Sequence, residues 1–336
     1  MRILIIQTGF LGDAVLATGL LRGLARYREC HVGMVVRGAY AELFEHHPRL
    51  RWLHPFQKQA KGGFAEVLES IKKVQYDLAV VPHRSARSAL LAWLAGIPRR
   101  IGFRQSELPL LFTDTVEYHI FHQETDRNAA LLEPAGLFAA PRSPWLSPSP
   151  HDFIPMLPYA AEGRALVLIA PGSVWPTKRW GAEGFAAVAR QLTARGAAVK
   201  LIGSEAEREL CQQIAAQAGL PQSHNLAGKL TLRQLAMLIA MSAHLVANDS
   251  APVHLATSLG TPVTAIFGPT VPGFGFGPNE EGSSVVEAGP LGCRPCDIHG
   301  PARCPIGTHQ CMADITPQMI LATISIPTLS PSDLEP

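Results

Sequence analysis

A group of polar residues with the chemistry of a phosphate site follows an apolar run in the second half of the chain. Residues 245–247 are all apolar and predict a buried strand, after which Asp249 and Ser250 lie in a polar turn. A helix is predicted next, with Ser250 able to cap its start and Gly260 ending it after about two turns. The start of a helix carries roughly half a positive charge. With Asp249 and His254 beside it, this helix start suits a nucleotide diphosphate.

A lone acid, Asp13, follows the first apolar run of the chain. Residues 2–7 predict a strand, and the next six turn it into a helix expected from about 14 to 28. A side chain at that point lies over the carboxyl edge of a parallel sheet, where one carboxylate is enough to take a proton from an attacking hydroxyl. The ordinary alternative is an acid that only favours the first turn of the helix. The glycines at 9 and 12 do not fit G-x-G-x-x-G, which argues against a nicotinamide oxidoreductase.

Five arginines and no acidic residue lie between residues 78 and 106. Guanidinium groups bind phosphate and carboxylate through two parallel hydrogen bonds, so the segment predicts an anionic partner at this edge of the first domain. The alternative is that these arginines form only a solvated basic face. The five are Arg84, Arg87, Arg99, Arg100 and Arg104.

The composition fits a protein of two domains. The chain has 336 residues, of which 47% are hydrophobic, enough for two cores. A formal charge of +2 is too small for general nucleic-acid binding. The amino terminus has no signal-peptide core, because Asp13 interrupts its apolar run, and no later stretch is long enough to span a bilayer. These features predict a soluble cytoplasmic protein.

Strands and helices alternate along both halves, which predicts two α/β domains with parallel sheets. Apart from the segments above, strands are expected at 32–36, 78–81, 165–170, 199–202 and 263–267, and helices at about 181–195, 205–217 and 231–241. A proline-rich stretch from 139 to 158 is the predicted linker, and the tail beyond 324 is expected to be disordered.

Five segments together resemble the ADP-heptose:lipopolysaccharide heptosyltransferases of glycosyltransferase family 9, most of all the heptosyltransferase II group. They are GDAVLATGLLRGL (12–24), VVPHRSARSALLAWLAGIPRRIGFR (80–104), APGSVWPTKRW (170–180), NLAG (225–228) and NDSAPVHLATSLGTPVTAIFGPT (248–270). The resemblance implies a GT-B fold, in which two Rossmann-like domains face a central cleft. Residues 1–150 would bind the acceptor and 151–324 the nucleotide sugar.

The resemblance also implies a reaction. L-glycero-D-manno-heptose would pass from ADP-heptose to the first heptose of the lipopolysaccharide inner core, with inversion at the anomeric carbon and without a required metal or cofactor. Asp13 matches the family's general base, and the neighbouring Gly12 would contact ADP-heptose. The arginines Arg84, Arg87 and Arg100 would hold phosphate or Kdo carboxylates of an anionic, lipid-linked acceptor, met transiently at the inner face of the cytoplasmic membrane.

Several residues of the second half match the family's site for ADP-heptose. Lys178 would stabilise the charge that grows on departing ADP. The other matching positions are Asp249, Ser250 and His254, with Ala251 where the family usually has glycine, the candidate hydroxyl donors Ser173 and Thr177, and either Glu205 or Glu207 at the ribose. Alanine at 251 would weaken binding if that backbone needs a positive φ.

Four cysteines form C-x2-C-x7-C-x6-C in a loop rich in glycine and proline, at residues 293–311. Four thiols so close together could hold a structural zinc ion or an iron–sulfur cluster, and ordinary thiols are the alternative. The cysteines are Cys293, Cys296, Cys304 and Cys311.

Two alternatives to the leading function remain. A related heptosyltransferase acting on Kdo or on another acceptor would have the same residues for ADP-heptose. A non-catalytic protein that binds nucleotide sugars would also keep the second domain's site, and the retained Asp13 argues against it.

Overall fold

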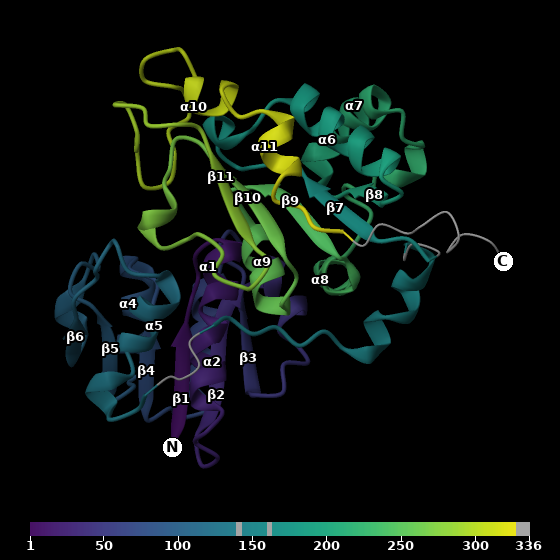
Figure 1. The fold of residues 1–336 in the computed structure, drawn as a ribbon. Coiled ribbons are helices and arrows are strands. Elements are labelled where there is room, and N and C mark those ends of the chain that lie inside the picture. Colours follow the sequence, from purple (N-terminus) through teal and green to yellow (C-terminus); the bar gives the residue numbers. More distant parts are fainter. Residues whose placement is uncertain (139–142, 160–162, 327–336) are drawn as a thin grey trace. The chain divides into compact units, whose positions relative to one another are not determined.

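The computed structural model describes residues 1–138, 143–159 and 163–326. The chain divides into two compact units, Met1–Ser149 and Pro150–Pro336 (Figure 1). Each unit holds one wholly parallel sheet, six-stranded in the first and five-stranded in the second. Within the described ranges, no helix has the length and apolar composition needed to cross a membrane. Both halves are therefore α/β domains, as the sequence predicts.

The first unit has the strand order β3-β2-β1-β4-β5-β6. Because β1 pairs with β2 on one side and β4 on the other, the order reverses direction between β1 and β4, where ligands bind in sheets of this kind. Its strands are β1 (Arg2–Ile6), β2 (His31–Arg37), β3 (Leu50–Phe56), β4 (Leu78–Val81), β5 (Arg99–Phe103) and β6 (Asp114–Val116).

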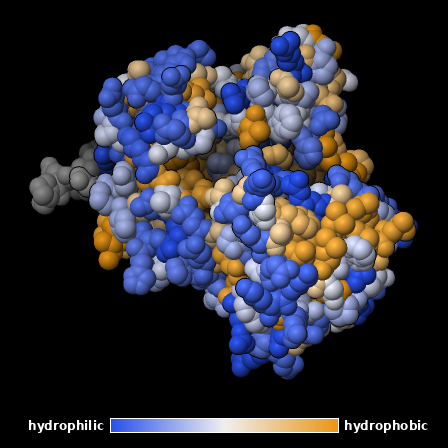
Figure 2. Space-filling view, turned by 180° about the vertical axis from the view of Figure 1, so that it is seen from behind, coloured by the Kyte–Doolittle hydropathy of each residue, from blue (hydrophilic) through white to orange (hydrophobic). Residues whose placement is uncertain are grey.

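Helices cover the first sheet and complete its core. The α-helices are α1 (Leu11–Leu16), α2 (Thr18–Leu24), α3 (Gly63–Lys72), α4 (Ala86–Leu94) and α5 (Glu124–Ala130), and the 3-10 turns are η1 (Gly38–Leu43), η2 (Pro109–Leu111) and η3 (Glu133–Ala135). Apolar residues of α3 and α4 pack on β1 and β4. Figure 2 shows that apolar side chains also gather on the outer surface of this unit.

Three strands of the first unit were not expected, and the first helix was placed wrongly. Strand β3 lies between the strands predicted at 32–36 and 78–81, while β5 begins with two arginines and β6 has only three residues. The helix expected from 14 to 28 begins at Leu11, is interrupted at Ala17 and ends at Leu24. Asp13 therefore lies inside the first turn of α1 rather than in the loop before it.

The second unit has the strand order β11-β10-β9-β7-β8, so its direction reverses between β7 and β9. The strands are β7 (Leu166–Ala170), β8 (Ala198–Leu201), β9 (His244–Asn248), β10 (Val263–Phe267) and β11 (Ser284–Glu287). The helices are α6 (Ala182–Ala194), α7 (Arg208–Ala218), α8 (Leu232–Met241), α9 (Ala251–Leu259), α10 (Gln310–Ala313) and α11 (Pro317–Leu321), and the 3-10 turns are η4 (Pro150–Asp152), η5 (Ile154–Tyr159), η6 (Pro176–Lys178), η7 (Glu205–Glu207), η8 (Gln222–His224) and η9 (Pro272–Phe274).

The boundary segment is more structured than a linker. Residues 150–159 form η4 and η5, which pack on α8, and Arg233 Nη2 lies 3.0 Å from Asp152 Oδ1. The rest of the predicted linker includes residues 139–142, which lie outside the described residues. Most of the tail predicted to be disordered, 327–336, also lies outside them.

Candidate active site

A buried ion pair occupies the point where the second sheet reverses direction. Lys178 ends the η6 turn in the loop after β7, and Asp249 follows β9 directly. Lys178 Nζ lies 2.6 Å from Asp249 Oδ2, and the two residues are only 9% and 7% exposed. Two of the residues predicted to bind the nucleotide sugar are thus in contact, although 71 positions separate them in sequence.

Hydrogen bonds fix both partners of this pair. Thr270 Oγ1 donates to Asp249 Oδ2 at 2.7 Å. Asn248 joins the loop after β7 to the end of β9, because its amide donates to the Pro171 carbonyl at 2.7 Å and its side-chain oxygen accepts from the Trp180 backbone N–H at 3.1 Å. The loop that carries Lys178 is therefore held at both ends by one buried amide.

The start of α9 lies next to Asp249, as predicted, but Ser250 does not cap it. Ser250 occupies the N-cap position, yet its hydroxyl donates back to the Asn248 carbonyl at 3.1 Å, and no side chain caps the helix. Gly260 ends the helix with a φ of 74°. Ala251 is the first helical residue and is not among the described residues with positive φ, so alanine fits the backbone there.

His254 lies on the first turns of α9 and is 8% exposed. Burial lowers its pKa to about 4, while the Asp249 charge raises it and the Lys178 charge lowers it. The ring is thus neutral at pH 7 and can both donate and accept a hydrogen bond. Its electrostatic coupling to both members of the ion pair places all three predicted residues in one site.

The two predicted hydroxyl donors in the loop after β7 are buried. The Thr177 hydroxyl donates to the Pro301 carbonyl, and the Ser173 carbonyl accepts from Arg179 Nε at 2.8 Å. His309 Nε2 donates to the Thr177 carbonyl at 2.7 Å. These bonds attach the cysteine-containing segment 293–311 to the Lys178 loop.

The four cysteines of that segment are free thiols. Backbone N–H groups around Cys304, first that of His309, lower the pKa of its thiol, whereas burial raises the pKa of Cys296 and Cys311. Across the described parts of the chain, no group of three or more histidine, cysteine, aspartate or glutamate side chains is arranged to hold a metal ion.

The structure separates the two acids proposed for the ribose. Glu207 completes a capping box: its Oε2 accepts from the Ser204 N–H at 2.7 Å, and the carboxylate lies against Gly172 and Gly203, where a Cβ atom would collide with it. Glu205 is exposed and pairs with Arg208. Glu205 is therefore the more exposed of the two acids.

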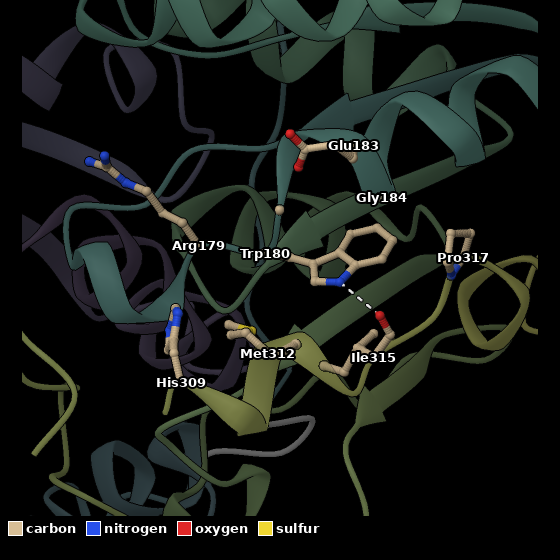
Figure 3. Close-up of a pocket in the computed structure, with 10 residues that line it drawn as sticks. Arg179, Trp180, Glu183, Gly184, His309, Met312, Ile315 and Pro317 are labelled. Atoms are coloured by element: carbon tan, nitrogen blue, oxygen red, sulfur yellow. Dashed lines mark hydrogen bonds between the residues drawn. The ribbon is translucent and has the colours of Figure 1, made fainter. Parts of the chain in front are cut away.

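A cavity of about 520 Å³ adjoins the same loop on the side of α6 and α10 (Figure 3). Its wall includes Arg179, Glu183 and His309, and the Trp180 indole N–H donates to the Ile315 carbonyl at 3.0 Å across it. It holds none of the residues predicted to bind the nucleotide sugar. The predicted site is the ion pair with the start of α9, not this cavity.

In the first unit, Asp13 lies at the reversal between β1 and β4. It is the third residue of α1, and its Oδ2 accepts from the Phe10 N–H at 2.9 Å. Gly9 is needed beside it, because a Cβ atom at that position would come within 2.8 Å of the same oxygen. The ordinary alternative, an acid in the first helical turn, thus describes its position.

Sequence reasoning missed a second acid near Asp13. Glu124 begins α5 and is 6% exposed; Arg127 Nη2 lies 2.6 Å from its Oε2, and the Tyr118 hydroxyl donates to the same oxygen at 3.0 Å. Burial raises the pKa of Glu124, Arg127 lowers it, and the Asp13 charge raises it further. Asp13 therefore lies within electrostatic reach of a buried carboxylate.

Basic side chains follow several strand ends around this point. Arg37 ends β2 and donates through Nε to the Thr8 carbonyl at 2.9 Å. Lys58 follows β3, and its pKa is lowered by burial and by the charges of Arg37 and Arg87. Burial, Lys58 and Arg37 together lower the pKa of His83, which follows β4, to about 4. Arg37 follows a predicted strand, and Lys58 follows a strand that was not predicted. Nothing else in the sequence singles out these two residues.

The three predicted acceptor arginines do not all lie together. The Arg84 guanidinium stacks 4.1 Å from the Tyr118 ring, with Arg127 4.5 Å from the same ring. Arg87 couples to Lys58. Arg100 instead donates through Nε to the Leu111 carbonyl at 2.7 Å, and through Nη1 to Ile97. Arg87 and Arg84 thus lie near Lys58 and His83, respectively, while Arg100 stabilises a loop.

Comparisons with known proteins agree on one family. The sequence model of glycosyltransferase family 9 (heptosyltransferase) matches residues 64–299. The chain is similar to lipopolysaccharide heptosyltransferase 2 of Escherichia coli K12, with 29% identity over 97% of this chain and 98% of the relative. It is also similar to lipopolysaccharide heptosyltransferase 1 of Pseudomonas aeruginosa, with 28% identity over 88% and 86% of the two chains. The solved structure of E. coli ADP-heptose lps heptosyltransferase II superposes with a TM-score of 0.78 at 27% identity, covering 96% of this chain and 97% of that one.

Proposed function

Because the chain belongs to glycosyltransferase family 9, the heptosyltransferases, we propose that it transfers L-glycero-D-manno-heptose from ADP-heptose to the first heptose of the lipopolysaccharide inner core. The donor is supported by the solved relative, an ADP-heptose heptosyltransferase of the same GT-B fold. The acceptor is supported by the relative named heptosyltransferase 2, which aligns over nearly the whole chain.

The observation that carries the proposal is the buried contact between Lys178 and Asp249 beside the start of α9. An ammonium group has three donors, and Asp249 takes one. The other two can bind oxygens of a diphosphate whose remaining charge faces the helix start. Asp249 thus orients the lysine, and the neutral His254 supplies a further hydrogen bond to the nucleotide sugar.

In the proposed reaction, Asp13 takes the proton from the acceptor hydroxyl as its oxygen attacks the anomeric carbon of the heptose. The new carbon–oxygen bond forms on the face opposite to ADP, and the bond to the diphosphate breaks with its electron pair going to ADP. The configuration is therefore inverted. Lys178 stabilises the charge that develops on the leaving diphosphate. A cation that is already in position stabilises such a charge most strongly where water is excluded. Glu205 binds the ribose hydroxyls.

The basic cluster in the first unit supports an anionic acceptor. Arg37, Lys58, Arg84 and Arg87 are within reach of His83 or of one another near the carboxyl edge of the sheet. Their charges suit the phosphates and Kdo carboxylates of a lipid-linked core, and guanidinium groups bind such anions in pairs of hydrogen bonds. We place the reaction in the cytoplasm, at the inner face of the membrane that holds the acceptor.

The test is an acceptor panel. Purified protein is incubated with ADP-heptose and with cores that end at Kdo or at the first heptose, and the products are read by mass. One added heptose on the second acceptor alone is the expected result. Addition to the Kdo-terminated core instead would mean a related heptosyltransferase that acts on Kdo. ADP-heptose binding without transfer to any acceptor would mean a non-catalytic nucleotide-sugar binding protein.

A further inference from the structure

We propose that an apolar surface on the first unit, made of Trp93, Leu94, Leu108 and Leu110, docks on an anionic phospholipid bilayer. We call it the α4 surface. The inference builds on the proposed function, because a lipid-linked acceptor has to be reached at a membrane. It adds the part of the molecule that makes this contact.

The α4 surface is exposed although its side chains are large and apolar. Leu110 is 96% exposed, Trp93 49%, Leu94 40% and Leu108 37%. Apolar side chains gather over this part of the first unit (Figure 2). Contiguous apolar areas on a protein surface usually mark a site of protein or membrane contact.

Helix α4 is apolar on both of its faces. Its inner face packs into the core through residues such as Leu91 and Ala92. Its outer face carries Trp93 and Leu94, and Arg87 is the one charged residue in the helix. A surface helix normally has a polar outer face. The outer face of α4 therefore has the composition of a helix in contact with another apolar phase.

The neighbouring loop extends the same surface and is rigidly held. The η2 turn packs on α4, with Leu111 and Phe112 turned towards the core and Leu110 turned outward. Arg100 fixes the turn by donating to the Leu111 carbonyl at 2.7 Å. The backbone at Leu110 is thus held in place, so the loop does not have to be ordered when this side chain inserts between lipids.

The charges around the α4 surface complement anionic headgroups. Arg99 is paired with Asp114, and Glu107 accepts from the Ala86 N–H at the start of α4. Neither Arg87 nor Arg100 has an ion pair with any carboxylate in the described residues. Basic residues close to an anionic membrane strengthen binding through attraction to its headgroups. Tryptophan and arginine side chains next to leucine side chains are typical of protein surfaces that lie at a membrane interface.

A second copy of the chain fits this surface less well. In a two-fold contact the same patch faces itself, so Arg87 and Arg100 of both copies would be buried in one interface. Glu107 accepts a hydrogen bond from the Ala86 N–H at the start of α4. A bilayer with anionic headgroups supplies the missing negative charge without this repulsion.

The test measures binding to vesicles in the absence of both substrates. Wild-type protein is mixed with vesicles of phosphatidylglycerol and phosphatidylcholine, or of phosphatidylcholine alone, and the bound fraction is read after flotation. We expect binding to the anionic vesicles. Leu110→Ser and Trp93→Ser should each weaken it by roughly tenfold or more, since each removes a large apolar side chain from the lipid. Phe138→Ser is the matched control, because Phe138 is 59% exposed in the same unit but outside the α4 surface.

Transfer to a soluble, deacylated core acceptor separates this inference from the proposed function. Leu110→Ser should transfer heptose to that acceptor at the wild-type rate, because Leu110 has no part in the active site. Equal vesicle binding by wild type, Leu110→Ser and Phe138→Ser would overturn the α4 surface and leave the proposed function intact. A concentration-dependent dimer that Leu110→Ser abolishes, without vesicle binding, would overturn it in favour of a second copy.

Discussion

Lys178 Nζ lies 2.6 Å from Asp249 Oδ2 at the point where the second sheet reverses direction. Removing one partner of a buried ion pair leaves the other charge without compensation, which typically costs 3–5 kcal/mol. Removing both costs less. The pair thus combines a structural role with the proposed binding of diphosphate.

The first prediction is a double-mutant cycle on that pair. Lys178→Met and Asp249→Asn should each lower the free energy of unfolding by about 3 kcal/mol, and the double variant by clearly less than their sum. Chemical denaturation measures all three. The exposed pair Glu205 and Arg208 is the control, and its coupling should stay below about 1 kcal/mol. Additive losses at Lys178 and Asp249 would contradict the buried pair.

A second prediction concerns the proposed base. Asp13→Asn keeps an oxygen that can accept from the Phe10 N–H, so the start of α1 should survive. Without a carboxylate, kcat should fall by roughly a hundredfold to ten-thousandfold, the usual contribution of a general base. Calorimetry should show ADP affinity within about twofold of wild type, since the nucleotide is assigned to the second unit. Wild-type turnover in this variant would remove Asp13 from the mechanism.

The sequence predicts the apolar strands well because a fully buried parallel strand needs an uninterrupted apolar run, as in β7, β9 and β10. It fails for the interior strand β5, because Arg99 and Arg100 interrupt its apolar run, and for β6, because an edge strand of three residues needs no such run. Strand order has no local signal at all. It is set by the packing of whole helices on the sheet.

The candidate site, like the strands, could be predicted only in part. Asp13, Lys178 and Asp249 could be identified one by one, because each follows a predicted strand, but their partners could not. Asp249 is 71 residues from Lys178, and Glu124 is brought to Asp13 only by the packing of α5 on α2. Such pairs depend on tertiary structure, so the local sequence pattern does not predict them.

The third prediction tests whether Glu124 acts through Asp13. Its negative charge opposes ionisation of Asp13. Glu124→Gln removes that charge, so the acid limb of the kcat profile should move to lower pH. The plateau rate should also fall, because a weaker base is a poorer proton acceptor. Glu124→Asp should restore the wild-type profile in part. A lower rate with an unmoved acid limb would mean that Glu124 only supports the fold.

The fourth prediction is a loss of stability in acid caused by a buried histidine. His244 is 2% exposed and bonded to Thr264 Oγ1, and burial lowers its pKa from 6.5 to about 4. The unfolded chain therefore binds a proton that the folded one does not, and the stability present above pH 6.5 is lost as the pH falls towards 4. The loss is at most about 3 kcal/mol for this residue.

The free energy of unfolding of His244→Gln should depend less on pH than that of wild type across that range. The difference between the two proteins above pH 7 measures the effect of the substitution on packing alone. Parallel curves would refute the assignment.

The last prediction distinguishes the two acids after β8. If Glu205 binds the ribose, Glu205→Gln should weaken ADP by roughly tenfold, the value of a hydrogen bond to a charged group, and should leave the affinity for 2′,3′-dideoxy-ADP unchanged. Glu207→Gln should act differently, because Glu207 accepts from Ser204 N–H in a capping box and lies against Gly172. It should lower the free energy of unfolding by about 1 kcal/mol and affect both nucleotides alike. Isothermal titration with the two nucleotides separates these outcomes, and a loss specific to ADP in Glu207→Gln would transfer the ribose contact from Glu205 to Glu207.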